Sequence, residues 1–151
     1  MYKSILIATD LLPASLPALR AGLRLAQEHG SRVGVLYVVE VWMVERRWFT
    51  SITQEDIAFH QAFLKREEVA ALRAVDVQTR QACADEGLEI DADAMVRDGR
   101  AADSIIAAAA ERGCDLVVIG TRRRSTTLGS VAEQVVRSAA QPVLVVPATI
   151  Q

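Results

Sequence analysis

Short runs rich in β-branched residues alternate with longer segments of helical periodicity along the chain. Short apolar runs bounded by turn-forming residues are typical of strands, whereas apolar residues three and four positions apart are typical of helices. A strict alternation of the two favours a parallel sheet, because each parallel connection needs a crossover that a helix supplies. The runs that we interpret as strands are Ser4–Thr9, Arg32–Val39, Glu89–Val96, Asp115–Gly120 and Val143–Val146.

The apolar pattern of these runs indicates how the sheet is covered. Four of them are almost continuously apolar, which is typical of strands with helices on both faces. Glu89–Val96 alternates polar and apolar residues instead, so we expect it at an edge with one face in solvent. With right-handed crossovers, the order predicts an α/β fold with a doubly wound, five-stranded parallel sheet. The 151 residues contain no linker and no internal repeat, which predicts a single domain over residues 1–151.

Two of the predicted helices have clear ends. Leu12–Ala26 carries leucines at helical spacing, and Gly30 follows as a C-cap. Ala102–Ala109 repeats in the same way and ends at Gly113.

Two further helices are predicted from other signals. Ser130 and Glu133 fit a capping box that opens a helix, which must end before Pro142. The longest helix extends from about Thr53 to Glu86 and is mostly polar. Its candidate buried residues are Phe59, Phe63, Leu72 and Val75.

Composition excludes several classes of function. The net charge is −2, from 17 basic and 19 acidic residues, which predicts no general attraction to nucleic acid or to an anionic membrane. No stretch approaches the roughly 18 apolar residues of a membrane span, and the apolar run near the N-terminus is too short for a signal peptide. Cys83 and Cys114 belong to no CxxC pair and no metal-binding pattern. We therefore expect a cytoplasmic protein with reduced thiols and no metal site.

Three features fall at the carboxyl ends of predicted strands, where open α/β sheets bind ligands. Asp10 follows the first strand, and Val38-Val39-Glu40 ends the second. The loop from Gly120 to Ser130 follows the fourth. Asp10 has two readings that the sequence leaves open: it meets a ribose hydroxyl or a metal-bound phosphate, or it caps the turn into the next helix.

The Gly120–Ser130 loop has the chemistry of an anion site. Gly129 and Ser130 precede a helix whose free N–H groups and dipole favour negative charge. Arg122, Arg123 and Arg124 add forked donors suited to phosphate. The competing reading is that Ser130 only caps its helix and the arginines are solvated.

No catalytic constellation is visible in the sequence. Its two histidines, His29 and His60, both fall outside the strand ends, and no Ser/His/Asp or Cys/His set forms. The irregular segment 41–52 contains Trp42, Trp48 and Phe49, which either pack as a lid over the sheet end or form a partner-binding patch. We expect no dedicated catalytic centre.

Several segments, in order along the chain, resemble the universal stress protein family. The first is Met-Tyr-Lys-Ser-Ile-Leu-Ile-Ala-Thr-Asp10, and the second is Val35-Leu-Tyr-Val-Val-Glu40. The others are Val96-Arg-Asp-Gly99, Cys114-Asp-Leu-Val-Val-Ile-Gly-Thr121, Gly129-Ser130-Val-Ala-Glu-Gln-Val-Val and Pro142-Val-Leu-Val-Val-Pro147. The resemblance implies the strand order 3-2-1-4-5 and a homodimer. In that order the last strand is a sheet edge, so the expected interface is Val143, Leu144, Val145, Val146 and Pro147.

One branch of that family binds ATP through a loop of pattern G-x2-G-x9-G-[ST]. By this resemblance Gly120 matches the first glycine, Gly129 and Ser130 match the last pair, and Val131 follows. Asp10 matches the acid after the first strand, and the backbone at Val38 and Val39 would meet adenine. The chain departs from the pattern twice: Arg123 replaces the second glycine, and the loop is four residues short.

These features support three readings of function. The first is a stress-response regulator that binds an ATP-like nucleotide weakly, with or without magnesium, through the shortened loop. The second is a stress-response dimer that binds no nucleotide and acts through protein partners. The third is a slow nucleotide hydrolase, for which no general base or metal pair is identifiable.

Overall fold

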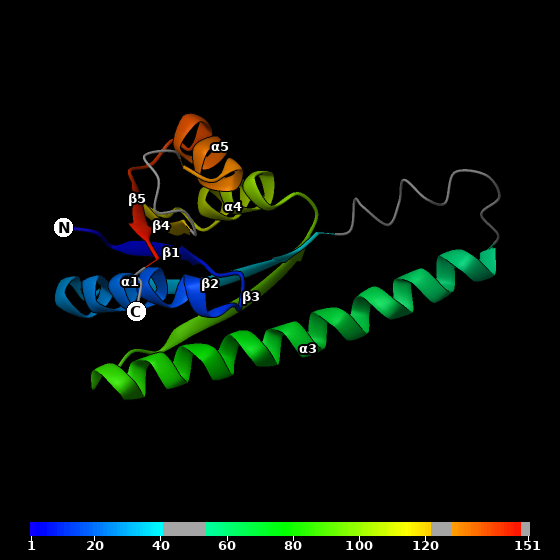
Figure 1. Ribbon diagram of the computed structural model, residues 1–151, viewed down its shortest axis with the longest axis horizontal. Coiled ribbons are helices and arrows are strands. Elements are labelled where there is room, and N and C mark those ends of the chain that lie inside the picture. The colour runs from blue at the N-terminus through cyan, green and yellow to red at the C-terminus, as the bar shows by residue number, and fades with distance from the viewer. Residues whose placement is uncertain (41–53, 122–127, 149–151) are drawn as a thin grey trace.

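The computed structural model describes residues 1–40, 54–121 and 128–148. Strands and helices alternate through these residues, as the sequence predicts (Figure 1). The elements are β1 (Ser4–Ala8), η1 (Pro13–Ser15), α1 (Leu16–His29), β2 (Arg32–Val39), α3 (Gln54–Glu86), β3 (Ala92–Asp98), α4 (Ala101–Glu111), β4 (Leu116–Thr121), α5 (Ser130–Ser138) and β5 (Val143–Pro147).

The five strands form one parallel sheet in the order β3-β2-β1-β4-β5. This confirms the predicted topology, with β1 in the centre and the alternating strand β3 at an edge. Every residue of β1 is buried, because strands pair with both of its edges and helices cover both of its faces. β5 is only partly buried, and Leu144 is exposed to 36%.

The core consists of two layers separated by the sheet. Successive side chains of a strand point to opposite faces. Ile5 and Ile7 therefore pack under α1 and α3, while Leu6 and Ala8 pack under α4 and α5. Figure 1 shows the two helix pairs on opposite sides of the sheet. The core is aliphatic, and α1 approaches β1 so closely at Gly22 that an added Cβ would lie 2.5 Å from the Ile7 side chain.

Several predicted boundaries are wrong by a few residues. The first strand ends at Ala8, and the third begins at Ala92 and continues to Asp98. Pro13–Ser15 forms a 3-10 turn, so α1 begins at Leu16 rather than near Leu12. Asp115 lies just before β4, and its carboxylate accepts hydrogen bonds from the N–H groups of Lys3, at 2.9 and 3.1 Å, and Ser4, at 3.0 Å. These bonds hold the pKa of the Asp115 carboxyl below its ordinary value.

The end signals of the helices are largely confirmed. Gly30 and Gly87 both adopt φ of 65°, the left-handed conformation of a helix C-cap. α4 ends at Glu111, and Gly113 follows with φ of 63°. The predicted capping box is wrong, because Gly129, which has no side chain, is the N-cap of α5, and among the described residues no side-chain cap bond is formed there.

The long helix α3 differs most from its prediction. Val75 is fully buried, as expected, but Phe59, Phe63 and Leu72 are exposed to 74%, 48% and 43%. For Phe59 and Phe63 the reason is length, since a helix of 33 residues extends about 50 Å whereas the eight residues of β2 extend about 26 Å. Leu72 lies in the part of α3 that packs on the core, next to the buried Ala71, but its own side chain stays exposed. Figure 1 shows the N-terminal part of α3 extending past the sheet.

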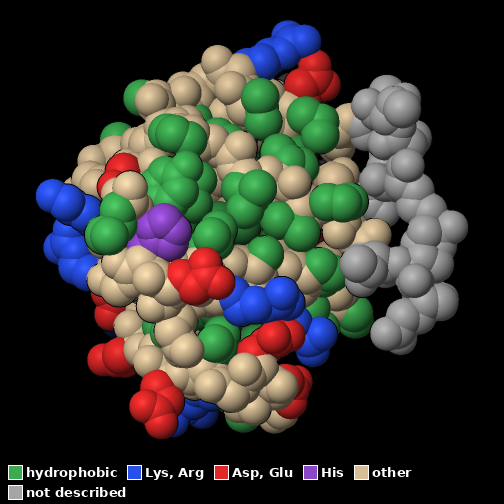
Figure 2. Space-filling view, turned by 90° about the vertical axis from the view of Figure 1, so that its left-hand side faces the viewer, with side chains coloured by type: hydrophobic (Ala, Val, Ile, Leu, Met, Phe, Trp, Pro, Cys, Tyr) green, Lys and Arg blue, Asp and Glu red, His purple; other side chains and the backbone are tan. Residues whose placement is uncertain are grey.

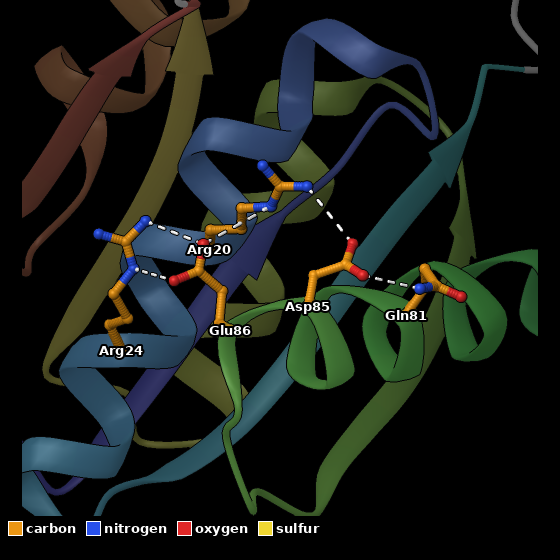
Figure 3. Close-up of polar contacts among 5 residues, drawn as sticks. All are labelled: Arg20, Arg24, Gln81, Asp85 and Glu86. Atoms are coloured by element: carbon orange, nitrogen blue, oxygen red, sulfur yellow. Dashed lines mark hydrogen bonds and ion pairs between the residues drawn. The ribbon is translucent and has the colours of Figure 1, made fainter.

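The other end of α3 is joined to α1 by charged side chains (Figure 3). Arg24 contacts Glu86 with Nε to Oε2 at 3.1 Å and Nη2 to Oε1 at 3.4 Å. Arg20 Nη2 lies 3.5 Å from Asp85 Oδ2, and its Nε lies 3.9 Å from Glu86 Oε1. Gln81 donates a hydrogen bond to Asp85 from the preceding turn. The two helices on this face are therefore linked at one end by paired charges.

Candidate functional site

A cavity of about 800 Å³ opens at the carboxyl ends of β1, β2 and β4. The chain winds away from β1 in opposite directions on its two sides, so this is the switch point at which open α/β sheets bind ligands. The predicted residues Asp10, Val38, Val39, Gly120, Gly129, Ser130 and Val131 all line it. Its other described lining residues are Ala8, Thr9, Leu12, Ala14, Ser15, Leu36, Tyr37, Glu40, Ala101, Ile105, Ile119, Thr121 and Ala132.

Some predictions concern residues that the structure does not describe. Arg122, Arg123 and Arg124 lie outside the described residues, as do Trp42, Trp48 and Phe49. The arginine contribution to anion binding and the role of the aromatic segment stay predictions.

The N-terminus of α5 supplies the main anion-binding geometry of the cavity. The first N–H groups of a helix have no carbonyl partner within it. In α5 the N-cap Gly129 has an extended backbone and provides no side-chain acceptor, and Gly129 through Ala132 line the cavity. The positive end of the helix dipole adds to these donors.

A second helix begins at the same cavity. Ala101 is the first residue of α4, follows Arg100 in an extended conformation and has no side-chain cap. Ala101 and Ile105 line the cavity opposite the end of β2. The N-termini of α4 and α5 therefore both lie at this cavity, and the positive ends of the two helix dipoles favour the binding of an anion there.

The end of β2 offers backbone groups at the cavity wall. The Leu36 carbonyl accepts from the N–H of Thr9 on the β1 side, and the Val39 carbonyl accepts from the N–H of Gly99 on the β3 side. Successive residues of a strand direct their backbone groups to alternate neighbours. Val38 therefore directs its N–H and C=O toward β1, beyond the point where that strand has ended. Val38, rather than Val39, has the backbone orientation suited to a planar base.

The two matching glycines serve different purposes. A Cβ on Gly120 would lie 3.3 Å from the Ala18 Cβ, so this position is kept small by packing against α1. A Cβ on Gly129 would meet no atom within 4 Å, and its φ of −65° suits any residue. Gly129 thus leaves open space at the helix N-terminus.

The comparisons with known proteins agree with this fold. Residues 1–147 match the Usp family, described as the universal stress protein family. The chain belongs to the universal stress protein family. It is 32% identical over 151 residues to universal stress protein MJ0531 of Methanocaldococcus jannaschii, covering 97% of this chain and 82% of that protein.

Two solved structures of universal stress proteins are similar in fold. One, from Archaeoglobus fulgidus in complex with dAMP, is 25% identical with a TM-score of 0.56, covering 95% of this chain and 97% of the other. Another, in complex with cAMP, is 20% identical with a TM-score of 0.68, covering 98% of both chains.

In this universal stress protein, the turn after β1 confirms the capping reading of Asp10, and the ligand-binding reading stays a prediction. Its Oδ1 accepts a hydrogen bond from the N–H of Leu12 at 2.9 Å, which stabilises the turn, and the residue also lines the cavity. Leu11 has φ of 65°, the one described non-glycine residue in the left-handed region. The turn that carries Asp10 is therefore strained and closely hydrogen-bonded.

Sequence reasoning missed Thr9, Ser15 and the start of α4. Thr9 and Ser15 are buried polar side chains whose hydroxyl oxygens lie 3.0 Å apart under the Asp10 turn. The sequence does carry a signal for the start of α4, because Gly99-Arg100 follows the carboxyl end of β3. Among the described residues, no cluster of three His, Cys, Asp or Glu side chains fits a metal ion. In the same part of the chain no helix is long and apolar enough to cross a membrane.

Proposed function

We propose that this universal stress protein binds an adenine nucleotide in the cavity and acts as a nucleotide-responsive stress regulator. The observation that carries the proposal is the uncapped N-terminus of α5, whose first turn lines the cavity at the end of the sheet. A nucleotide phosphate is the ligand that supplies the missing acceptors.

The remaining lining suits the other parts of a nucleotide. The backbone groups of Val38 suit the edge of an adenine, and Asp10 suits a ribose hydroxyl or a metal-bound phosphate. The similar protein from Archaeoglobus fulgidus was crystallised with dAMP, and another with cAMP, which supports a ligand of this class. The resemblance of the Gly120–Ser130 loop to the ATP-binding pattern implies ATP with magnesium, so this ligand is included in the titration below.

Binding should be weak and salt-dependent. The loop between Gly120 and Gly129 is four residues shorter than the ATP-binding pattern, so less backbone surrounds additional phosphates. Arg122, Arg123 and Arg124 would replace part of that contact with charge, which salt screens over about 8 Å at physiological ionic strength.

Calorimetric titration of nucleotide-free protein tests the proposal. AMP, cAMP, and ATP with Mg²⁺ should each be titrated at low and high salt. Gly129→Asp should abolish binding because its carboxylate caps the N–H groups and repels phosphate. The same substitution should leave the fold intact or stabilise it by a few tenths of a kcal/mol, since Asp is a better N-cap than Gly. Gly129→Ala is the control, because the added methyl group meets open space.

Two results would count against this assignment. If no nucleotide binds at millimolar concentration, the protein acts through partners alone. If Gly129→Asp binds as wild type does, the phosphate lies elsewhere. Unchanged binding in the triple variant Arg122→Ala, Arg123→Ala and Arg124→Ala would show that the arginines do not contribute. The helix N-terminus would then be the anion-binding group.

We further propose that the protein is a cytoplasmic homodimer that pairs through β5. Cys83 and Cys114 are both free, which supports a reducing compartment. β5 is a sheet edge with unpaired backbone groups, and Leu144 is its exposed apolar side chain. Light scattering should show a dimer at micromolar concentration that Leu144→Lys converts to a monomer and Val77→Lys, on exposed α3, does not. A wild-type monomer would refute the dimer.

The proposal involves neither nucleic acid nor membrane. Figure 2 shows the end of the molecule that lies at the left of Figure 1, where acidic and basic side chains are mixed around a group of hydrophobic ones. No broad surface of one charge is visible on this face, in agreement with the net charge of −2.

A further inference from the structure

A side chain from α3 reaches the turn that carries Asp10. Thr9 Oγ1 donates a hydrogen bond to Gln78 Oε1 at 2.8 Å, across 69 residues of sequence. The same oxygen accepts a hydrogen bond from the N–H of Leu11 at 3.1 Å. Thr9 is buried and lines the cavity, so this bond links α3 to the cavity lining.

The turn needs such support because its backbone is strained. Leu11 has φ of 65°, where the Cβ of an L-residue is crowded. Hydrogen bonds within the turn run from the Leu11 N–H to Thr9 Oγ1, from the Leu12 N–H to Asp10 Oδ1, and from both the N–H and the hydroxyl of Ser15 to the Leu12 carbonyl. These bonds fix the shape of the turn, and the Thr9 N–H joins its start to the Leu36 carbonyl of β2 at 2.9 Å. The Thr9 hydroxyl oxygen also lies 3.0 Å from the Ser15 hydroxyl oxygen, so the orientation of this hydroxyl depends on partners inside and outside the turn.

Gln78 supplies a fixed point outside the turn. It belongs to the part of α3 in which Val75 and Thr79 are buried, so its Cα position is set by the core. The hydrogen bond to Gln78 orients the Thr9 hydroxyl. The same hydroxyl oxygen accepts the hydrogen bond from the Leu11 N–H.

We propose that Gln78 is a positioning residue that holds the Asp10 turn in its ligand-binding geometry by orienting Thr9. This inference rests on the proposed nucleotide site for its functional readout, but the positioning itself is a property of the ligand-free protein. Gln78 does not line the cavity, so it acts through Thr9 rather than by touching the ligand.

Two matched variants separate this role from general packing. Gln78→Met keeps the length of the side chain and removes the hydrogen bond. Gln81→Met is the control, because Gln81 lies on the same helix, is exposed, and donates to Asp85 rather than to the turn. Amide hydrogen exchange by NMR in the ligand-free protein should show the Leu11 N–H exchanging at least about tenfold faster in Gln78→Met, since its acceptor is no longer fixed. The Gln81→Met protein should match wild type.

Nucleotide affinity provides the second readout. Loss of one hydrogen bond predicts a dissociation constant for AMP about fivefold higher in Gln78→Met, and no change in Gln81→Met. In a Thr9→Val background Gln78→Met should add nothing, because the two residues act as one unit. Additive effects in that double variant would overturn the proposal.

The two readouts keep this inference separate from the proposed function. If wild type binds no nucleotide, the proposed function fails, and Leu11 exchange alone decides the role of Gln78. Leu11 exchange in Gln78→Met equal to wild type overturns the inference, whatever the nucleotide results. Faster exchange restricted to Leu11 and its neighbours in the turn confirms it.

Discussion

The two halves of α3 belong to one continuous helix but have different surroundings. In residues 71–86 the helix buries Ala71, Val75, Thr79, Ala82 and Cys83, and Arg20 and Arg24 bind its end. In residues 54–70 none of the described side chains is buried, and Phe59 is exposed to 74%. The halves differ in what lies beneath them rather than in helix-forming tendency.

This difference shows that apolar side chains stabilise a helix only where another element covers them. Phe59 offers more apolar area than Val75, yet only Val75 contributes that area to the core. Isolated helices of about 15 residues are marginal in water, so the N-terminal half depends on its continuity with the packed half. The contrast between the halves can be measured by amide exchange, by global stability and by the response of stability to salt.

Hydrogen exchange should separate the halves most strongly. We expect amides in residues 71–86 to be protected at least about a hundredfold more than those in residues 58–69, because the packed half opens only with the core. NMR or mass spectrometry after peptide digestion measures this directly. Equal protection in the two halves would show that something covers the N-terminal half in solution.

Paired valine truncations should show the same contrast in global stability. Val75→Ala removes two methyl groups from a fully buried site and should lower the free energy of unfolding by about 2 kcal/mol. Val77→Ala, at a site exposed to 66%, should change it by less than about 0.5 kcal/mol. Urea denaturation of both variants is the measurement, and similar losses would contradict the comparison.

The ion pairs between α1 and the C-terminal end of α3 should contribute least to the stability of the packed half. Glu86→Gln keeps the shape of the side chain but weakens its contacts with Arg20 and Arg24. We expect the free energy of unfolding to fall by about 0.5 kcal/mol at low salt, and the difference from wild type to largely disappear at 1 M salt. Asp76→Asn, whose carboxylate pairs with Arg80 inside α3, is the control, with an expected loss of about 0.3 kcal/mol or less. A salt-independent loss in Glu86→Gln would mean that packing, not charge, joins the helices.

The local sequence signals were sufficient for the alternation of strands and helices and for the parallel sheet, whereas the strand order came from the family resemblance. The apolar runs of β1 and β4 and the alternation in β3 report burial directly. Phe59 and Phe63 were misassigned because helical spacing shows which side chains share a face, not whether the sheet is long enough to cover them. Strand ends were predicted only to within a few residues, because apolar runs do not show where pairing begins. Asp115 pairs its N–H with the Ser4 carbonyl and adds side-chain bonds to Lys3 and Ser4.

The site was predictable where it consists of strand ends and helix starts. Asp10, Val38, Gly129 and Ser130 follow from their places in the alternation, and all line the cavity. The Thr9–Gln78 contact was not predictable, because it joins residues 69 positions apart and neither residue carries a motif. Such contacts depend on the register of a helix over a sheet, which no local pattern specifies.

The central place of β1 has a consequence for synthesis of the chain. Lys3 and Asp115, which join the starts of β1 and β4, are 112 residues apart, so β1 leaves the ribosome long before one of its two edges can be paired. At usual rates of translation this interval is on the order of 10 seconds. Through that interval Ile5, Leu6 and Ile7 lack the cover that β4 provides at one edge in the finished protein. The most buried strand of the finished protein is therefore the one that chaperones have the longest opportunity to bind in the nascent chain.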